Sequence, residues 1–165
     1  MSSEPPNLLR LAQALEAVPD LRYVLVGGLA VTMHGGTRVT VDADLAIAFE
    51  VENRRRLVAA LAPLNPRPLR IASGAAWEWD EKCIRGPWSI FQTDAGRVDL
   101  IIRLPDGISF EDLFGRAVYF DLMGTPVRVA SIEDLVLMKT QAGRERDRDD
   151  INQLLAIQRL RAEQG

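Results

Sequence analysis

Two aspartates, Asp42 and Asp44, are separated by one residue in a short run with the composition of a strand. Because side chains alternate across a strand, positions two apart share a face, with α-carbons roughly 6.5 Å apart. Mg²⁺ prefers oxygen ligands and keeps positions open for substrate phosphates, so the pair indicates phosphoryl or nucleotidyl transfer. The alternative is a solvated strand end, because 23 acidic residues among 165 produce such a spacing by chance.

The sequence around the pair favours the chemical interpretation. Apolar side chains occupy every second position, at Val41, Ala43, Leu45, Ile47 and Phe49. This alternation predicts a strand over residues 41–49 with one apolar face. We expect the two aspartates to lie on the opposite face of that strand.

A glycine pair, Gly27–Gly28, stands between an apolar run and a short helical segment. Residues 23–26 have the composition of a strand, and residues 29–34 predict a helix that ends at a second glycine pair, Gly35–Gly36. A glycine turn here lets a phosphate approach backbone N–H groups at the positive end of a helix. The alternative is a tight strand-to-helix turn that only needs a positive φ.

A third carboxylate, Asp99, lies within an apolar run that predicts another strand. Burying a carboxylate alone is costly, so Asp99 either pairs with an arginine such as Arg97 or Arg103, or joins Asp42 and Asp44 at a metal. If this strand lies next to the Asp42–Asp44 strand, all three acids lie at one sheet edge. Three carboxylates could there hold two Mg²⁺ ions, as in the two-metal mechanism.

The remaining elements must position these groups. Helices are predicted over residues 7–18, 51–64, 131–142 and 144–162, and a short one from Ser109. Hairpins are predicted over residues 89–104 and 118–129, whereas residues 69–86 show no clear pattern. Hairpins interleaved with helices predict an α+β fold, a mixed and mostly antiparallel sheet covered by helices, with C-terminal helices. We expect residues 1–165 to form a single domain.

Composition excludes several classes of protein. One cysteine, Cys83, and one histidine, His34, are too few for an intrachain disulfide or a zinc cluster. A net charge of -3 argues against broad electrostatic binding of nucleic acid. No apolar run approaches the ~20 residues that span a bilayer, and the first residues lack the features of a signal peptide. We therefore expect a soluble, cytoplasmic protein without a membrane partner.

Four short motifs together resemble the polymerase-beta-like nucleotidyltransferase superfamily. Within it they are most similar to small bacterial proteins of the AbiEii type, which belong to abortive-infection and toxin-antitoxin systems. The motifs are Gly27–Ala30 with His34–Gly35, Arg38–Asp44, Val98–Asp99 and Lys139–Asp150, and the resemblance runs from about residue 22 to 155. The chain lacks the extra domain that shapes the acceptor site of larger members, which leaves the acceptor open.

The resemblance implies transfer of a nucleoside monophosphate from an NTP to an acceptor hydroxyl, with Mg²⁺ or Mn²⁺. Its motifs place Asp42, Asp44 and Asp99 at the metal as catalytic residues, Lys139 as a catalytic residue, and Gly27, Gly28, Arg38, Thr40 and Arg144 at the NTP. The implied acceptors are tRNA, protein or a small molecule, and a cognate antitoxin is an implied partner. The rival hypothesis is a non-catalytic nucleotide- or partner-binding module on the same fold.

Several of these polar residues also have structural interpretations. Lys139 lies on a predicted helix, where a lysine commonly extends to solvent. Arg144, Asp147 and Asp150 are three residues apart, so they either form local ion pairs or help to hold Lys139 or the nucleotide. His34 is interpreted as a helix-end or core histidine rather than a general base.

Overall fold

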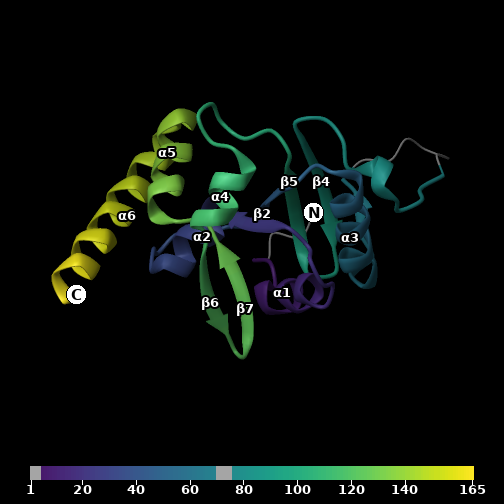
Figure 1. Cartoon of the computed structure of the whole chain (residues 1–165), viewed down its shortest axis with the longest axis horizontal. Helices are drawn as coiled ribbons and strands as arrows, with labels where there is room; N and C mark the ends of the chain where they lie inside the picture. Colours follow the sequence, from purple (N-terminus) through teal and green to yellow (C-terminus); the bar gives the residue numbers. More distant parts are fainter. Residues whose placement is uncertain (1–4, 70–75) are drawn as a thin grey trace.

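The computed structural model describes residues 5–69 and 76–165 (Figure 1). Residues 70–75, inside the segment for which the sequence predicts no element, lie outside the described residues, as do residues 1–4. In chain order the elements are α1 (Leu8–Glu16), β1 (Tyr23–Val26), α2 (Gly27–His34), β2 (Asp42–Ile47), α3 (Val51–Leu61), η1 (Ala62–Leu64), β3 (Arg67–Pro68), η2 (Glu81–Cys83), β4 (Trp88–Thr93), β5 (Gly96–Ile101), α4 (Phe110–Arg116), β6 (Val118–Leu122), β7 (Thr125–Val129), α5 (Ile132–Ala142) and α6 (Glu145–Gln164).

Seven strands form one sheet in the order β3-β4-β5-β2-β1-β7-β6. Both predicted hairpins, β4–β5 and β6–β7, are present and antiparallel. The β1–β2 and β3–β4 pairs are also antiparallel, whereas β5 runs parallel to β2 and β7 parallel to β1. The prediction of an α+β fold with a mixed, mostly antiparallel sheet is therefore confirmed.

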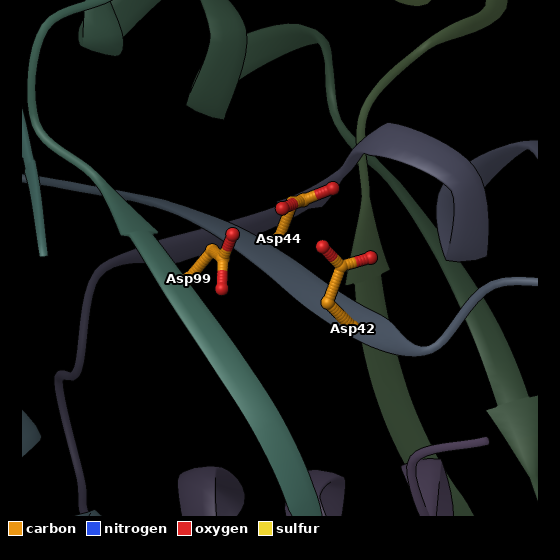
Figure 2. Close-up of side chains that lie close together, drawn as sticks. All are labelled: Asp42, Asp44 and Asp99. Carbon is orange, nitrogen blue, oxygen red and sulfur yellow. The ribbon is translucent and has the colours of Figure 1, made fainter. Parts of the chain in front are cut away.

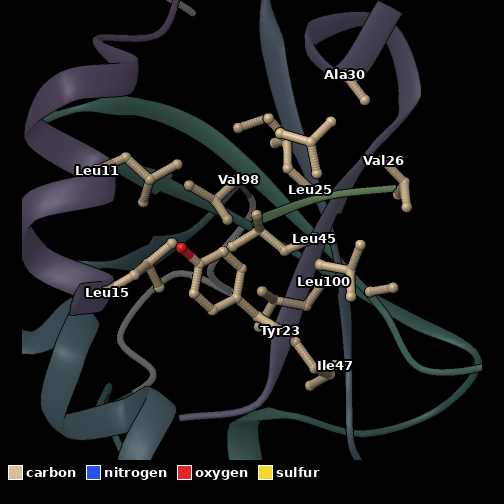
Figure 3. Close-up of a cluster of buried hydrophobic side chains, with 14 of the residues drawn as sticks. Leu11, Leu15, Tyr23, Leu25, Val26, Ala30, Leu45, Ile47, Val98 and Leu100 are labelled. Carbon is tan, nitrogen blue, oxygen red and sulfur yellow. The ribbon is translucent and has the colours of Figure 1, made fainter. Parts of the chain in front are cut away.

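One face of the sheet is buried beneath α1 and α3. Figure 3 shows Leu11 and Leu15 of α1 beside Leu45 of β2 and Val98 of β5, and all four side chains are buried. Burial of each large apolar side chain contributes about 1.5–3 kcal/mol, so this contact fixes which way β2 and β5 face. Because side chains alternate, the residues between these apolar ones project from the other face.

The predicted strand over residues 41–49 is too long at both ends. Val41 and Phe49 lie outside β2 and are about half exposed, whereas the three central apolar positions are buried. The helix predicted over residues 51–64 also differs, since α3 ends at Leu61 and η1 follows. Pro63 accounts for this change, because proline has no N–H to continue the α-helical hydrogen bonds.

Short polar side chains begin three of the helices in the described part of the chain. The side chains of Asn7, Ser109 and Ser131 each accept a hydrogen bond from a backbone N–H three residues ahead, at the starts of α1, α4 and α5. Helices α5 and α6 pack against each other and against α2, at the opposite end of the molecule from α3 (Figure 1). No helix in the described part of the chain is long and apolar enough to cross a bilayer.

Candidate active site

Three carboxylates converge on the sheet face that α1 and α3 leave open. Asp44 of β2 lies directly opposite Asp99 of β5, and Asp42 shares their face (Figure 2). One oxygen of each carboxylate lies within 4.8 Å of the other two. Oxygens bound to one Mg²⁺ lie about 3 to 4 Å apart, so small side-chain rotations would bring these onto an ion.

The expectation that these acids lie at a sheet edge is wrong. Strands β2 and β5 are interior strands, flanked by β1 on one side and β4 on the other. The carboxylates therefore project from the middle of the sheet, with protein on both sides of them. This position gives a substrate two distinct directions from which to approach.

Neighbouring side chains orient two of the three acids. Thr40 Oγ1 donates a hydrogen bond of 2.8 Å to Asp42 Oδ1. Arg97 donates to both oxygens of Asp99, over 2.7 and 2.8 Å. The sequence left open whether Asp99 pairs with an arginine or joins the other acids, and in the structure it does both.

The third acid, Asp44, carries negative charge that the protein itself does not fully compensate. Burial, followed by the nearby charges of Asp42 and Asp99, raises the pKa of Asp44 to about 7, although Arg97 and Lys139 act in the opposite direction. A divalent cation among these oxygens would remove that repulsion. The donors are all carboxylate oxygens, which fit Mg²⁺ or Mn²⁺.

Strand β1 runs directly into α2, which begins at Gly27 rather than at the predicted Leu29. Gly27 has φ +68°, and a Cβ at this position would collide with the Asp44 carboxylate. The residue must therefore be glycine for both conformation and space. No side chain of the described residues caps the first turn of α2, so its N–H groups and positive dipole are available to an anion beside the acids.

Arg38 lies over this helix start. A Cβ at Gly28 would approach Arg38 Nε to 3.2 Å, so the guanidinium is close to the backbone of the first turn. Arg38 is also paired with Asp150 of α6, at 2.5 Å. The pairing holds the Arg38 guanidinium beside the uncapped first turn of α2.

Lys139 is buried, with only 4% of its surface exposed, so the interpretation that it extends to solvent is wrong. Its Nζ lies 2.7 Å from Asp150 and 3.4 Å from Asp147. Arg144 pairs with Asp147 at 2.8 Å. Burial pushes the pKa of Asp147 upward, but Arg144 and Lys139 outweigh it and hold the pKa below its ordinary value. Asp147 and Asp150 of α6 thus pair with Arg38, which precedes β2, with Lys139 of α5 and with Arg144 at the start of α6.

One hollow of about 490 Å³ brings the candidate residues together. It is lined by all nine residues proposed from the sequence: Gly27, Gly28, Arg38, Thr40, Asp42, Asp44, Asp99, Lys139 and Arg144. Their individual roles stay predictions. Arg97 and Arg146 also line the hollow and were not assigned to the site. The sequence indicated Arg97 only as a possible partner of Asp99, and its place two residues earlier on one strand sets it on the same face.

His34 lies apart from the hollow, at the end of α2. Its buried ring donates from Nε2 to the Ala130 carbonyl at 2.8 Å, which leaves Nδ1 to accept from Arg161 at 3.2 Å. Burial lowers the pKa of His34, and this favours the neutral ring. The structural interpretation of His34 is therefore correct.

Solved structures with this fold include enzymes that modify antibiotics. The antibiotic-resistance factor ANT(2″)-Ia has a TM-score of 0.60 and 16% identity, over 94% of this chain and 88% of that chain. The lincosamide antibiotic adenylyltransferase LnuA has a TM-score of 0.59 and 15% identity, over 93% and 99%. An antigenic nucleotidyltransferase-like protein from Paracoccidioides brasiliensis has a TM-score of 0.54 and 18% identity, over 97% and 78%. At these identities the likeness shows the fold.

The mixed sheet and its helices have the fold of these solved structures, and three carboxylates converge on that sheet. The chain belongs to the family described as "Nucleotidyltransferase of unknown function (DUF6036)", which matches residues 7–164. A comparison with curated proteins finds no match. The class predicted from the four motifs is thus confirmed, whereas the family match does not address the AbiEii type.

Proposed function

We propose that the protein transfers a nucleoside monophosphate from an NTP to an acceptor hydroxyl by a two-metal mechanism with Mg²⁺ or Mn²⁺. The observation that carries this proposal is the convergence of three carboxylates beside an uncapped helix start, in a hollow also lined by cations. Phosphoryl-type transfer depends mainly on positioning and charge stabilisation, which such a site supplies.

The donor triphosphate binds on the α2 side of the acids. Gly27 and Gly28 let the phosphates approach the N–H groups of the first turn, and Arg38 contacts them from above. Arg144 lies at the rim of the same hollow. Lys139 adds a buried positive charge that favours the phosphates and keeps Asp147 and Asp150 from repelling them.

Asp42, Asp44 and Asp99 hold the metal. When bound, Mg²⁺ neutralises phosphate charge and lowers the pKa of an attacking hydroxyl. The acceptor oxygen forms a bond to the α-phosphorus as the bond to pyrophosphate breaks, and Asp99 accepts the hydroxyl proton. Arg97 keeps the Asp99 carboxylate aimed at the site through its two hydrogen bonds.

The convergence of three carboxylates supports transfer over the partner-binding form of the rival, and the transfer assay separates it from a non-catalytic nucleotide-binding module. A module that only binds a partner has no need for three mutually repelling carboxylates. Related structures support a small-molecule acceptor, since LnuA is lincomycin-bound and ANT(2″)-Ia is in complex with adenylyl-2″-tobramycin. A toxin role with a cognate antitoxin, as the AbiEii resemblance implies, stays a prediction.

The test is transfer of label from each α-phosphate-labelled NTP, with Mg²⁺, to total tRNA, to cell protein or to a pool of hydroxyl-bearing metabolites. Wild type and Asp149→Asn, an exposed acid on α6, should transfer label. Asp42→Asn and Asp44→Asn should lose at least about 10²-fold, as expected when charge stabilisation is removed. NTP binding without transfer to any acceptor, or equal transfer by the variants, would overturn the proposal.

A further inference from the structure

We propose that the acceptor binds on the open face of β4 and β5, over Trp88, Ile90 and Ile101, and that it is a small hydroxyl-bearing molecule with an apolar face. The inference rests on the proposed function, because it names the second substrate of the same site. It assigns a binding role to three residues outside the nine that the motifs indicate.

The direction of approach follows from the strand order. In an in-line displacement the attacking oxygen and the leaving pyrophosphate lie on opposite sides of the phosphorus. The phosphates lie toward α2, which follows β1, and β1 borders β2 on one side. On the other side of β2 are β5 and then β4. The acceptor hydroxyl therefore reaches Asp99 from above the β4–β5 hairpin.

The surface at that place is apolar. Ile90 lies directly opposite Asp99, and Trp88 lies opposite Ile101 on the same face. A hollow of about 380 Å³ is lined by these three apolar residues together with Asp44, Arg97 and Asp99. Trp88 is 62% exposed, so its ring is available to a ligand. The acceptor hydroxyl would lie at the acidic end of this hollow, and the apolar body of the acceptor would lie over Trp88, Ile90 and Ile101.

Asp44, Trp88 and Ile101 also line a larger cavity of about 650 Å³ against α5, which extends to Gly27, Lys139 and Arg144 on the nucleotide side. Leu135 and Met138 of α5 add apolar surface there, and Arg103 adds a polar group. Small-molecule sites commonly have about 300–1,000 Å³ and mostly apolar walls with a few polar groups. This size and lining favour a small molecule over a nucleic acid, which is held chiefly through its phosphates.

Simple alcohols can test the site without knowledge of the true acceptor. Binding of benzyl alcohol and of glycerol is measured by saturation-transfer NMR, with Mg²⁺ and a non-hydrolysable α,β-methylene ATP present. The variants are Trp88→Ala and Ile90→Thr, where Thr keeps the branched shape of a strand residue. Tyr119→Ala is the matched control, because Tyr119 is an aromatic residue 58% exposed on β6, at the far edge of the sheet.

Wild type and the control should bind benzyl alcohol in preference to glycerol, and both variants should bind it at least about tenfold more weakly. Affinity for the nucleotide analogue should not change. Unaltered benzyl alcohol binding in both variants would overturn the proposal. Weaker nucleotide binding in both variants would also overturn it, because this surface would then be the nucleoside site. A third contrary result is displacement of benzyl alcohol by an oligonucleotide but not by cyclohexylmethanol.

Failure here is distinguishable from failure of the proposed function. Asp42→Asn should lose label transfer and yet retain benzyl alcohol binding, because Asp42 does not line the hollow over β4 and β5. If wild type transfers label and Trp88→Ala does not weaken benzyl alcohol binding, the proposed function stands and the assigned acceptor surface is wrong.

Discussion

Replacement of Asp44 by asparagine should stabilise the metal-free protein at neutral and alkaline pH while it abolishes transfer. Asparagine has nearly the same shape as aspartate but no charge, so the cost of burying the charge and the repulsion from Asp42 and Asp99 both disappear. The buried face of β2 is unaffected, because Ala43 and Leu45 point the other way. The substitution therefore separates the cost of the charge from the packing of the strand.

The size of the effect follows from the pKa. The value for Asp44 rises from 3.8 to about 7, and each pKa unit corresponds to about 1.4 kcal/mol. The full shift gives an upper bound of about 4 kcal/mol. Part of the carboxylate faces the hollow, where water relieves the penalty, so we expect about 2 to 4 kcal/mol. For a protein of this size that corresponds to a Tm increase of roughly 5 to 15 °C.

The pH dependence has a definite sign. Between pH 3.8 and about 7 the folded protein keeps a proton on Asp44 that the unfolded chain has released. Folding is therefore linked to proton uptake, and the contribution of this group to stability falls as the pH rises through that window. The penalty is complete above about pH 7. The gain in stability of Asp44→Asn over wild type should thus be largest at pH 8 and smallest near pH 4.

Thermal unfolding in EDTA across this pH range measures the difference, with Asp149→Asn as the control for loss of one exposed acid. The reasoning is refuted if Asp44→Asn is no more stable than wild type at pH 8. It is equally refuted if the gain is the same at pH 4 and pH 8, because the gain would then not come from the charge.

Three further predictions concern the neighbouring groups. Mg²⁺ should raise the Tm of wild type more at pH 8 than at pH 6, because the ion competes with a proton at the acids, and an equal rise would contradict this site. Gly27→Ala should abolish transfer and lower stability by about 1–2 kcal/mol for the backbone conformation, and by more because its Cβ would collide with the Asp44 carboxylate. Gly124→Ala, with the same sign of φ in open space, should lose only the conformational part and retain transfer. Asp150→Asn should lower the free energy of unfolding by about 3 kcal/mol, because it leaves the buried Lys139 short of a partner, and should raise the KM for NTP. Asp149→Asn should do neither. Unfolding curves and initial rates measure the two effects.

Much of the fold was predictable because local patterns decide it. Both hairpins have strand formers around a short turn, and the polar caps of α1, α4 and α5 mark where those helices begin. The errors are at element ends, where a single residue decides. Pro63 shortens α3, and Gly27 allows the helix to follow β1 without a separate turn.

The residues that gather in the hollow could be named from the sequence, but their arrangement could not. The motif spacing identifies Asp42, Asp44 and Asp99, yet nothing local shows that β5 lies beside β2 in the register that sets Asp99 opposite Asp44. The burial of Lys139 is equally invisible, because its neighbours in sequence fit an exposed helical lysine. Its partner Asp150 comes from the next helix, and only the packing of α5 on α6 brings them together.

The geometry around Asp44 is difficult to explain by folding alone. Its carboxylate lies against Gly27, which adopts a left-handed conformation, and burial together with two other carboxylates raises its pKa. An uncharged residue at position 44 would relieve the repulsion without disturbing Leu45 or the buried face. A buried carboxylate that repels two others, beside a helix start with free N–H groups, is what a site for a metal-bound triphosphate requires. The stability that Asp44→Asn should recover is therefore a direct measure of what the fold gives up to keep that site.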